Sequence, residues 1–196
     1  MVYRQAIGSG DPDVAIEAMY QLALQTRHQD KDAARALLEQ VIATGHPEWA
    51  GAAMVGLAHL QDGDPAAAEA LYRRAMAAGN DEWSGHAALD LGELLEGTGD
   101  VAGAKAVWQP LIDAADPEWA GAAFLELVNL LRGEADAAGL RAAYQAAVAL
   151  GNPEALYALD QLGHLLHDQG DAGARTRCGR RPSTPDMRTP KTCASR

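Results

Sequence analysis

The sequence has few cysteines, few aromatic side chains and no long apolar run. Its two cysteines, Cys178 and Cys193, lie in the last twenty residues, so the rest of the chain has no disulfide or thiolate metal site. No apolar stretch approaches the roughly eighteen residues of a membrane helix, and the start lacks a signal-peptide pattern. We therefore expect a cytoplasmic protein without a membrane partner.

Positive charge is also scarce in most of the chain. Residues 1–174 carry 9 basic and 26 acidic side chains, whereas residues 175–196 carry 7 basic side chains and one acid. The acidic charge of residues 1–174 disfavours binding of nucleic acid and favours a polar or basic partner. Ala and Leu are abundant and Phe occurs once, which predicts close-packed helices and almost no strand.

What the sequence does have is internal repetition. The segment Pro-Glu-Trp-Ala-Gly-Ala-Ala at residues 47–53 returns unchanged at 117–123, and returns altered at 81–87. Two columns of residues share spacings of 35, 34, 36 and 36: Val14, Trp49, Trp83, Trp119 and Ala155, and Tyr3, Leu38, Tyr72, Trp108 and Tyr144. A unit of about 35 residues holds two helices and two turns, and such an array acts through the surface that it presents.

Each unit contains ordered helix signals. In residues 45–48 and 151–154, Gly is placed to end one helix in a left-handed cap. His or Asn then stands at the next N-cap, Pro at the first helical position and Glu in the first turn. Pro110 lies inside a predicted second helix, where we expect a kink or a missing hydrogen bond.

These residues resemble the tetratricopeptide repeat family. Its pattern is present in the third unit as Leu91-Gly92, Gly99-Asp100, Ala104 and Trp108. Departures occur at Leu57-Ala58 and at Ala135-Asp136, where the family has Leu-Gly and Gly-Asp. The resemblance implies an all-α, right-handed α-solenoid of antiparallel helix pairs whose first helices line a concave binding face.

Counted with this unit, the chain begins in mid-repeat and ends in mid-repeat. The expected segments are the second helix of a truncated repeat at 1–9, repeats at 10–45, 46–79, 80–115 and 116–151, a fifth first helix at 152–171, and a basic tail at 172–196.

Two interpretations of the tail stay open. Its Arg, Pro and Thr content is typical of disorder. Alternatively, the shifted codon register permits Ala-Val-Trp-Gln-x-x-Ile-Asp-x-Gly-His, which matches residues 106–109 and 112–113 and then 45–46. A frameshift would have replaced the second helix of the fifth repeat and left its first helix uncovered, which favours self-association there.

No catalytic, metal or cofactor site is predicted. His164 and His167 share a helix face near Asp160 and Asp168, but no third ligand stands at useful spacing, so a solvated polar face is expected. Glu93 and Glu96 also share a face, and an open array favours solvated carboxylates over an acid–base pair. The repeated tryptophans are interpreted as packing residues rather than as ligand-stacking aromatics.

The resemblance implies a non-enzymatic protein interaction scaffold whose concave face binds a peptide or helix of a partner, with a polar or basic segment favoured. The alternative is a sensor or spacer fragment of a larger multidomain signalling protein, which the start in mid-repeat favours. Carried over by position, the expected exposed binding residues are Tyr20, Arg27, His59, Asp62, His86, Glu93, Glu96, Asn129, Arg132, Tyr157, Asp160 and His164.

Overall fold

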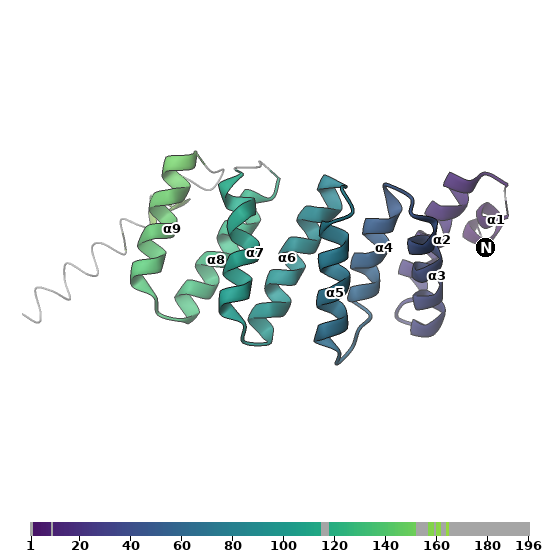
Figure 1. Cartoon of the computed structure of the whole chain (residues 1–196), viewed down its shortest axis with the longest axis horizontal. Helices are drawn as coiled ribbons and strands as arrows, with labels where there is room; N and C mark the ends of the chain where they lie inside the picture. The colour runs from purple at the N-terminus through teal and green to yellow at the C-terminus, as the bar shows by residue number, and fades with distance from the viewer. Residues whose placement is uncertain are drawn as a thin grey trace, which may run out of the picture.

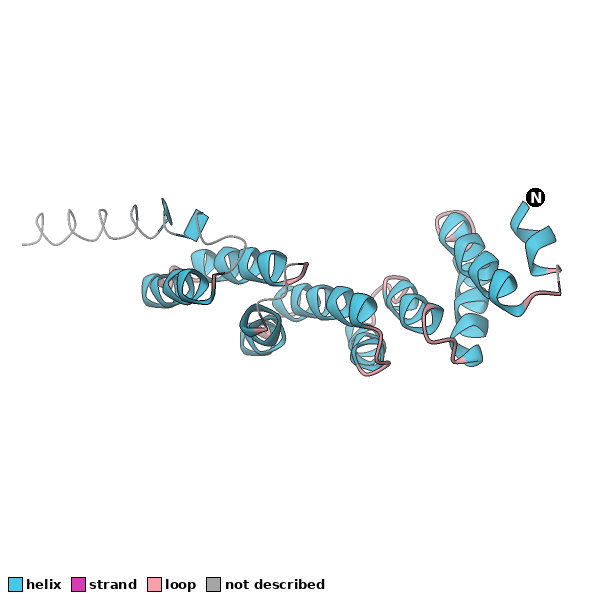
Figure 2. Cartoon of the chain, turned by 90° about the horizontal axis from the view of Figure 1, so that it is seen from above, coloured by secondary structure: helices cyan, strands magenta, loops and turns pink. Residues whose placement is uncertain are grey.

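The structure is a computed structural model that describes residues 2–8, 10–114, 118–151, 157–158, 160–161 and 164. Within these ranges the chain consists of helices and loops, without a strand (Figure 2). The helices are α1 (Val2–Ile7), α2 (Pro12–Thr26), α3 (Lys31–Thr44), α4 (Trp49–Ala58), α5 (Pro65–Met76), α6 (Asp81–Gly97), α7 (Val101–Asp113), α8 (Ala120–Gly133) and α9 (Ala137–Leu150).

The helices form a row in which each packs against the next along the chain. Figure 1 shows this row running from α1 at one end to α9 at the other. Helices α2, α4, α6 and α8 also contact one another directly. We call these four the first helices, and α3, α5, α7 and α9 the second helices. The all-α helical solenoid that the sequence predicts is confirmed.

Helix starts are fixed by side-chain caps. A capping oxygen accepts a backbone N–H near the start of six helices, which satisfies a donor that has no partner within the helix. The capping residues are Asp11, Asp30, Asp64, Asn80, Asp100 and Asp136.

The start of α4 differs from the expectation. His46 is the predicted N-cap and Pro47 the predicted first helical residue, yet α4 begins at Trp49. His46 still caps this end, because its Nδ1 accepts from the backbone N–H of Glu48 at 3.2 Å and of Trp49 at 3.4 Å. The His46 carbonyl also accepts from the N–H of Ala50 at 3.0 Å, so His46 is the N-cap as expected although the regular helix starts two residues after Pro47.

In the second, third and fourth repeats, a residue in the left-handed conformation precedes the capping Asp of the turn between the two helices. Gly63 and Gly99 hold this place with φ of 77° and 87°. Ala135 holds it in the fourth repeat with φ of 55°, the one positive value at a non-Gly position among the described residues. A Cβ is unfavourable in this conformation, so the fourth repeat carries local strain that the second and third do not.

The repeated Trp-x-Gly pattern is a packing device between neighbouring first helices. A Cβ at Gly85 in α6 would overlap the indole of Trp119, and a Cβ at Gly51 in α4 would lie 3.0 Å from the Cβ of Trp83. Each glycine therefore makes room for the tryptophan of the next repeat. The interpretation of the tryptophans as packing residues is confirmed.

A second glycine fits α7 onto α6. Trp108 is fully buried, and its Nε1 donates to the carbonyl oxygen of Leu89 at 3.4 Å. A Cβ at Gly92 would overlap this indole, which explains the Leu-Gly pair of the third repeat. Helix α7 continues through Pro110 to Asp113, although the proline nitrogen donates no hydrogen bond.

Several expectations fall on residues outside the described ranges. These are the whole basic tail with both cysteines and its frameshift interpretation, His167, Asp168 and most of the expected fifth first helix.

Candidate functional site: the exposed side of the first helices

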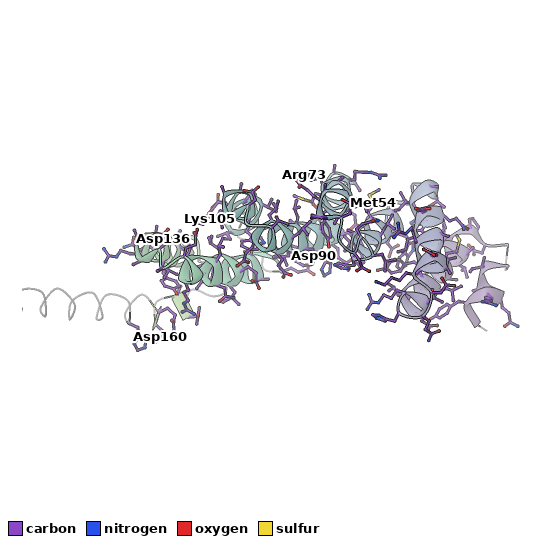
Figure 3. All side chains as sticks on the ribbon, turned by 90° about the horizontal axis from the view of Figure 1, so that it is seen from below. Met54, Arg73, Asp90, Lys105, Asp136 and Asp160 are labelled. Atoms are coloured by element: carbon purple, nitrogen blue, oxygen red, sulfur yellow. The ribbon has the colours of Figure 1, made fainter. Side chains whose placement is uncertain are left out.

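The exposed side of the first helices carries a cluster of four carboxylates. Asp90, Glu93 and Glu96 lie on successive turns of one side of α6, and Glu126 lies on the neighbouring α8. Figure 3 shows Asp90 on the side of the row opposite to Arg73 and Lys105, which belong to second helices. We call these four residues the acidic patch.

The acidic patch is electrostatically crowded around Glu93. Partial burial, followed by the charges of Glu126, Asp90 and Glu96, raises the pKa of Glu93, while His59 acts to lower it. Like charges that approach each other disfavour the ionised form, as does removal from water. The fold therefore holds these carboxylates together against their mutual repulsion.

His59 borders the acidic patch from α4's end. Its Nε2 lies 2.9 Å from Oδ2 of Asp90, and its ring meets Tyr72 edge-on at a centroid distance of 6.0 Å. With Glu93 and Leu94, these residues line an open pocket of about 290 Å³. Burial, then the charges of Asp90 and Glu93, raises the pKa of Tyr72, so its hydroxyl stays neutral and able to donate a hydrogen bond.

His59 also lines a second pocket. It has a volume of about 230 Å³ and is lined by Arg27, His28, Lys31, His59, Leu60 and Asp62, a set we call the Arg27 pocket. Arg27 donates from Nε to Nε2 of His28 at 3.1 Å, and Lys31 pairs with Asp62. This end of the first-helix side thus carries positive charge in a chain with few basic residues.

At the C-terminal end, Arg132 of α8 is held by side chains of the following helices. Its Nη2 donates to the Tyr144 hydroxyl at 3.2 Å and to Oε1 of Gln161. Burial acts to lower the pKa of Arg132, but hydrogen bonds to Tyr157 and Tyr144 raise it, so the cation is secure. Asp160 and Nε2 of His164 lie 3.7 Å apart on one helical turn.

The expected binding residues fall into separate groups. Glu93 and Glu96 share the acidic patch; Arg27, His59 and Asp62 share the Arg27 pocket; and Arg132 and Tyr157 meet at the C-terminal end. Asn129 is exposed on α8.

The expectation that Tyr20 is exposed is wrong. It is 7% exposed, and its ring packs on Trp49 at 5.3 Å and on Trp83 at 6.3 Å. His86 is half-buried, with its ring 5.1 Å from that of Trp83 and 4.6 Å from that of Trp119. Both side chains serve the aromatic packing between first helices, since their positions face the tryptophan of a neighbouring repeat.

Sequence reasoning missed four ionisable residues of the acidic patch and the Arg27 pocket, namely Asp90, Glu126, His28 and Lys31. Asp90 and Glu126 stand seven residues after Trp83 and Trp119, in one column of the repeat. That shared column is a signal from which both could have been found. His28 lies in the turn after α2 and Lys31 is the first residue of α3, and the repeat pattern assigns neither position to the binding face.

A larger apolar pocket of about 340 Å³ lies between α7, α8 and α9. It forms where α9 presents Ala142, Ala143 and Ala146. Its charged neighbours are already engaged, since Lys105 pairs with Glu134 at 2.8 Å and Asp136 accepts from the Gly139 N–H at 2.8 Å. The pocket therefore lacks an unengaged charge to orient a ligand.

Within the described ranges, no three His, Cys, Asp or Glu side chains converge as metal ligands. Nor is any helix there long and apolar enough to span a bilayer.

Comparison with known proteins agrees with this architecture. Residues 59–123 match the family model for the tetratricopeptide repeat. The crystal structure of BtubC (BKLC) from P. vanneervenii superposes with a TM-score of 0.62 at 16% sequence identity, covering 100% of this chain and 96% of that one. At such low identity the likeness concerns the fold alone. A search of curated proteins gave no match.

Proposed function

We propose that the chain, whose residues 59–123 match the tetratricopeptide repeat model, is a non-enzymatic interaction scaffold. Repeats of this family generally mediate protein–protein interaction. The ligand in this proposal is an extended or helical segment of another protein, bound across the first helices on the concave face. Its basic side chains contact the acidic patch.

The crowding of carboxylates around Glu93 carries this proposal. Away from the acidic patch, two acids pair closely with bases: Glu69 with Arg73 within α5 at 2.8 Å, and Glu134 at the end of α8 with Lys105 of α7 at 2.8 Å. Among the described residues, no Lys or Arg forms an ion pair with any member of the acidic patch. A ligand that supplies Lys or Arg provides the missing countercharge.

The surroundings of the patch suit a cationic side chain. The pocket beside it offers the Tyr72 ring and Leu94 to the methylene stem of a Lys or Arg, and carboxylates to its charged end. Each exposed ion pair contributes little by itself, about 0.2–1 kcal/mol. Several pairs together, and the long-range attraction of an acidic surface, favour a segment with more than one basic residue.

The test is binding of a fluorescent peptide that carries three Lys or Arg residues, measured by anisotropy at low and at physiological salt. We expect the combined substitutions Glu93→Gln and Glu126→Gln to weaken binding about tenfold, which corresponds to about 1.4 kcal/mol. The matched control is Asp32→Asn with Glu39→Gln on α3, which removes the same formal charge from the opposite layer.

Two results would contradict the proposal. One is equal affinity of the wild-type protein and the Glu93→Gln, Glu126→Gln variant. The other is equal affinity of the wild-type protein for the basic peptide and for a peptide of the same length with Glu at the basic positions.

A further inference from the structure

Two of the nine basic side chains of residues 1–174 come together in the Arg27 pocket. Arg27 and Lys31 line the Arg27 pocket together with His28 and His59. An acidic protein thus places a cationic pocket beside its most crowded acidic patch.

The Arg27 pocket retains unused hydrogen-bonding capacity. The Nε of Arg27 donates to Nε2 of His28 at 3.1 Å, and both side chains are exposed. A guanidinium has five N–H donors, and no carboxylate of the described residues forms an ion pair with Arg27. Its outer N–H groups are therefore available for a planar acceptor such as a carboxylate, which matches their fork-like geometry.

Asp62 does not close the pocket to an anion. Its charge is offset by Lys31, and the two side chains are 67% and 54% exposed. An exposed pair of this kind exchanges partners readily because water and salt screen it. Lys31 is thus able to turn toward a ligand carboxylate that Arg27 already holds.

Building on the proposed function, we infer that the binding face has a positive end and a negative end. The Arg27 pocket binds an Asp or Glu carboxylate of the same segment whose Lys or Arg contacts the acidic patch. His59 lines both pockets, so the two subsites are adjacent on one surface. A segment bound in this way has one direction, because reversal would bring like charges together.

The repeat geometry limits the spacing of the two charges. Arg27 follows α2 and Glu93 lies on α6, with α4 between them. Packed helices lie about 8–10 Å apart, so the outer ends of the two adjacent subsites lie up to about 20 Å apart. An extended chain advances about 3.3–3.6 Å per residue, so the acidic and basic residues of the ligand stand about six residues apart.

A simpler interpretation assigns Arg27 a purely structural role. It lies at the C-cap of α2, where a cation interacts favourably with the helix dipole. That role predicts that Arg27→Gln lowers thermal stability and leaves peptide selectivity unchanged. Selectivity is therefore the readout that separates the two interpretations.

The experiment measures binding of the full chain to three peptides of equal length. The first has a Glu six residues from a Lys pair, the second has Gln in place of that Glu, and the third has the Glu next to the Lys pair. We expect the first to bind about fivefold more tightly than the other two. With Arg27→Gln this preference disappears, whereas Arg74→Gln, an exposed basic residue of α5, retains it.

The outcomes separate the inference from the proposed function. If the wild-type protein binds all three peptides equally, the inference is wrong and the basic-segment proposal stands. If Arg27→Gln retains the full preference, the carboxylate binds elsewhere and the inference is again wrong. If none of the peptides binds, both fail. Circular dichroism of each variant checks that the helices are intact.

Discussion

The two sides of α6 differ in what they contribute to the protein. On the buried side, Gly85 and Gly92 admit the indoles of Trp119 and Trp108, and Leu91 is fully buried. On the exposed side, Asp90, Glu93 and Glu96 stand one turn apart and repel one another. The buried side of α6 stabilises the fold, whereas the exposed side carries charges whose repulsion lowers the stability of the fold.

This difference indicates where function lies in the array. Packing residues of a solenoid hold one repeat on the next, and they are explained once those contacts are known. Like charges on the opposite side have no such explanation, and residues that cost stability are typical of binding surfaces. The acidic patch, rather than the tryptophans, is therefore the expected binding surface.

The largest expected effect comes from the buried side. Gly92→Ala forces a Cβ into the indole of Trp108, and overpacking of this kind costs about 1–3 kcal/mol. We expect the midpoint of thermal unfolding, followed by circular dichroism, to fall by several degrees.

Its control is the same substitution combined with Trp108→Tyr. The second repeat has Ala58 and Tyr72 at these two positions, so the smaller ring should recover part of the loss. A double variant less stable than Gly92→Ala alone would show that the Gly92–Trp108 contact is not what limits this junction.

A smaller effect is expected at the turns that follow α6 and α8. Ala135→Gly relieves the positive φ and should stabilise the fourth repeat by about 0.5–1 kcal/mol. Gly99→Ala introduces the same strain after α6 and should destabilise by a similar amount. Urea unfolding curves measure both, and equal signs for the two substitutions would refute the explanation.

The smallest stability effect is expected on the exposed side. Glu93→Gln removes two unfavourable neighbours on α6, worth about 0.2–0.5 kcal/mol each, so the variant should be slightly more stable at neutral pH. Because the pKa of Glu93 is raised in the folded state, its ionisation disfavours folding. The gain should therefore vanish below about pH 4, where the glutamate is protonated in both states.

Unfolding curves at several pH values check this prediction, with Glu39→Gln as the control. A loss of stability in Glu93→Gln at pH 7 would mean that Glu93 makes a favourable contact in the free protein. Both sides of α6 would then stabilise the fold.

Much of the fold is predictable from the sequence, because its signals are local. The two columns of residues place the helix pairs, and capping residues such as Asp64 and Asn80 stand where the helices begin. His46 caps α4 as expected, and only the start of the regular helix differs, by two residues. Tyr20 was wrongly expected to be exposed, because its position on the binding side also faces Trp49 and Trp83, which only packing reveals.

The sites are less predictable, because they combine residues from different repeats. Glu93 was identified from its place on α6, but its crowding depends on Glu126 of α8 and on His59 of the second repeat. The Arg27 pocket joins a turn to the end of α4, and no helix periodicity connects them. Spacing along the chain predicts which residues share a helix face, and the stacking of repeats decides which faces meet.

The most direct measurement is a map of backbone amide shifts in the ¹H–¹⁵N spectrum as a Lys- and Arg-containing peptide is added to the full chain. We expect the largest changes in α6 between Gly85 and Gly97 and in the facing part of α8, with a salt-dependent amplitude. Changes concentrated in the second helices α3, α5 and α7, or no changes up to millimolar peptide, would contradict the assignment of the binding surface.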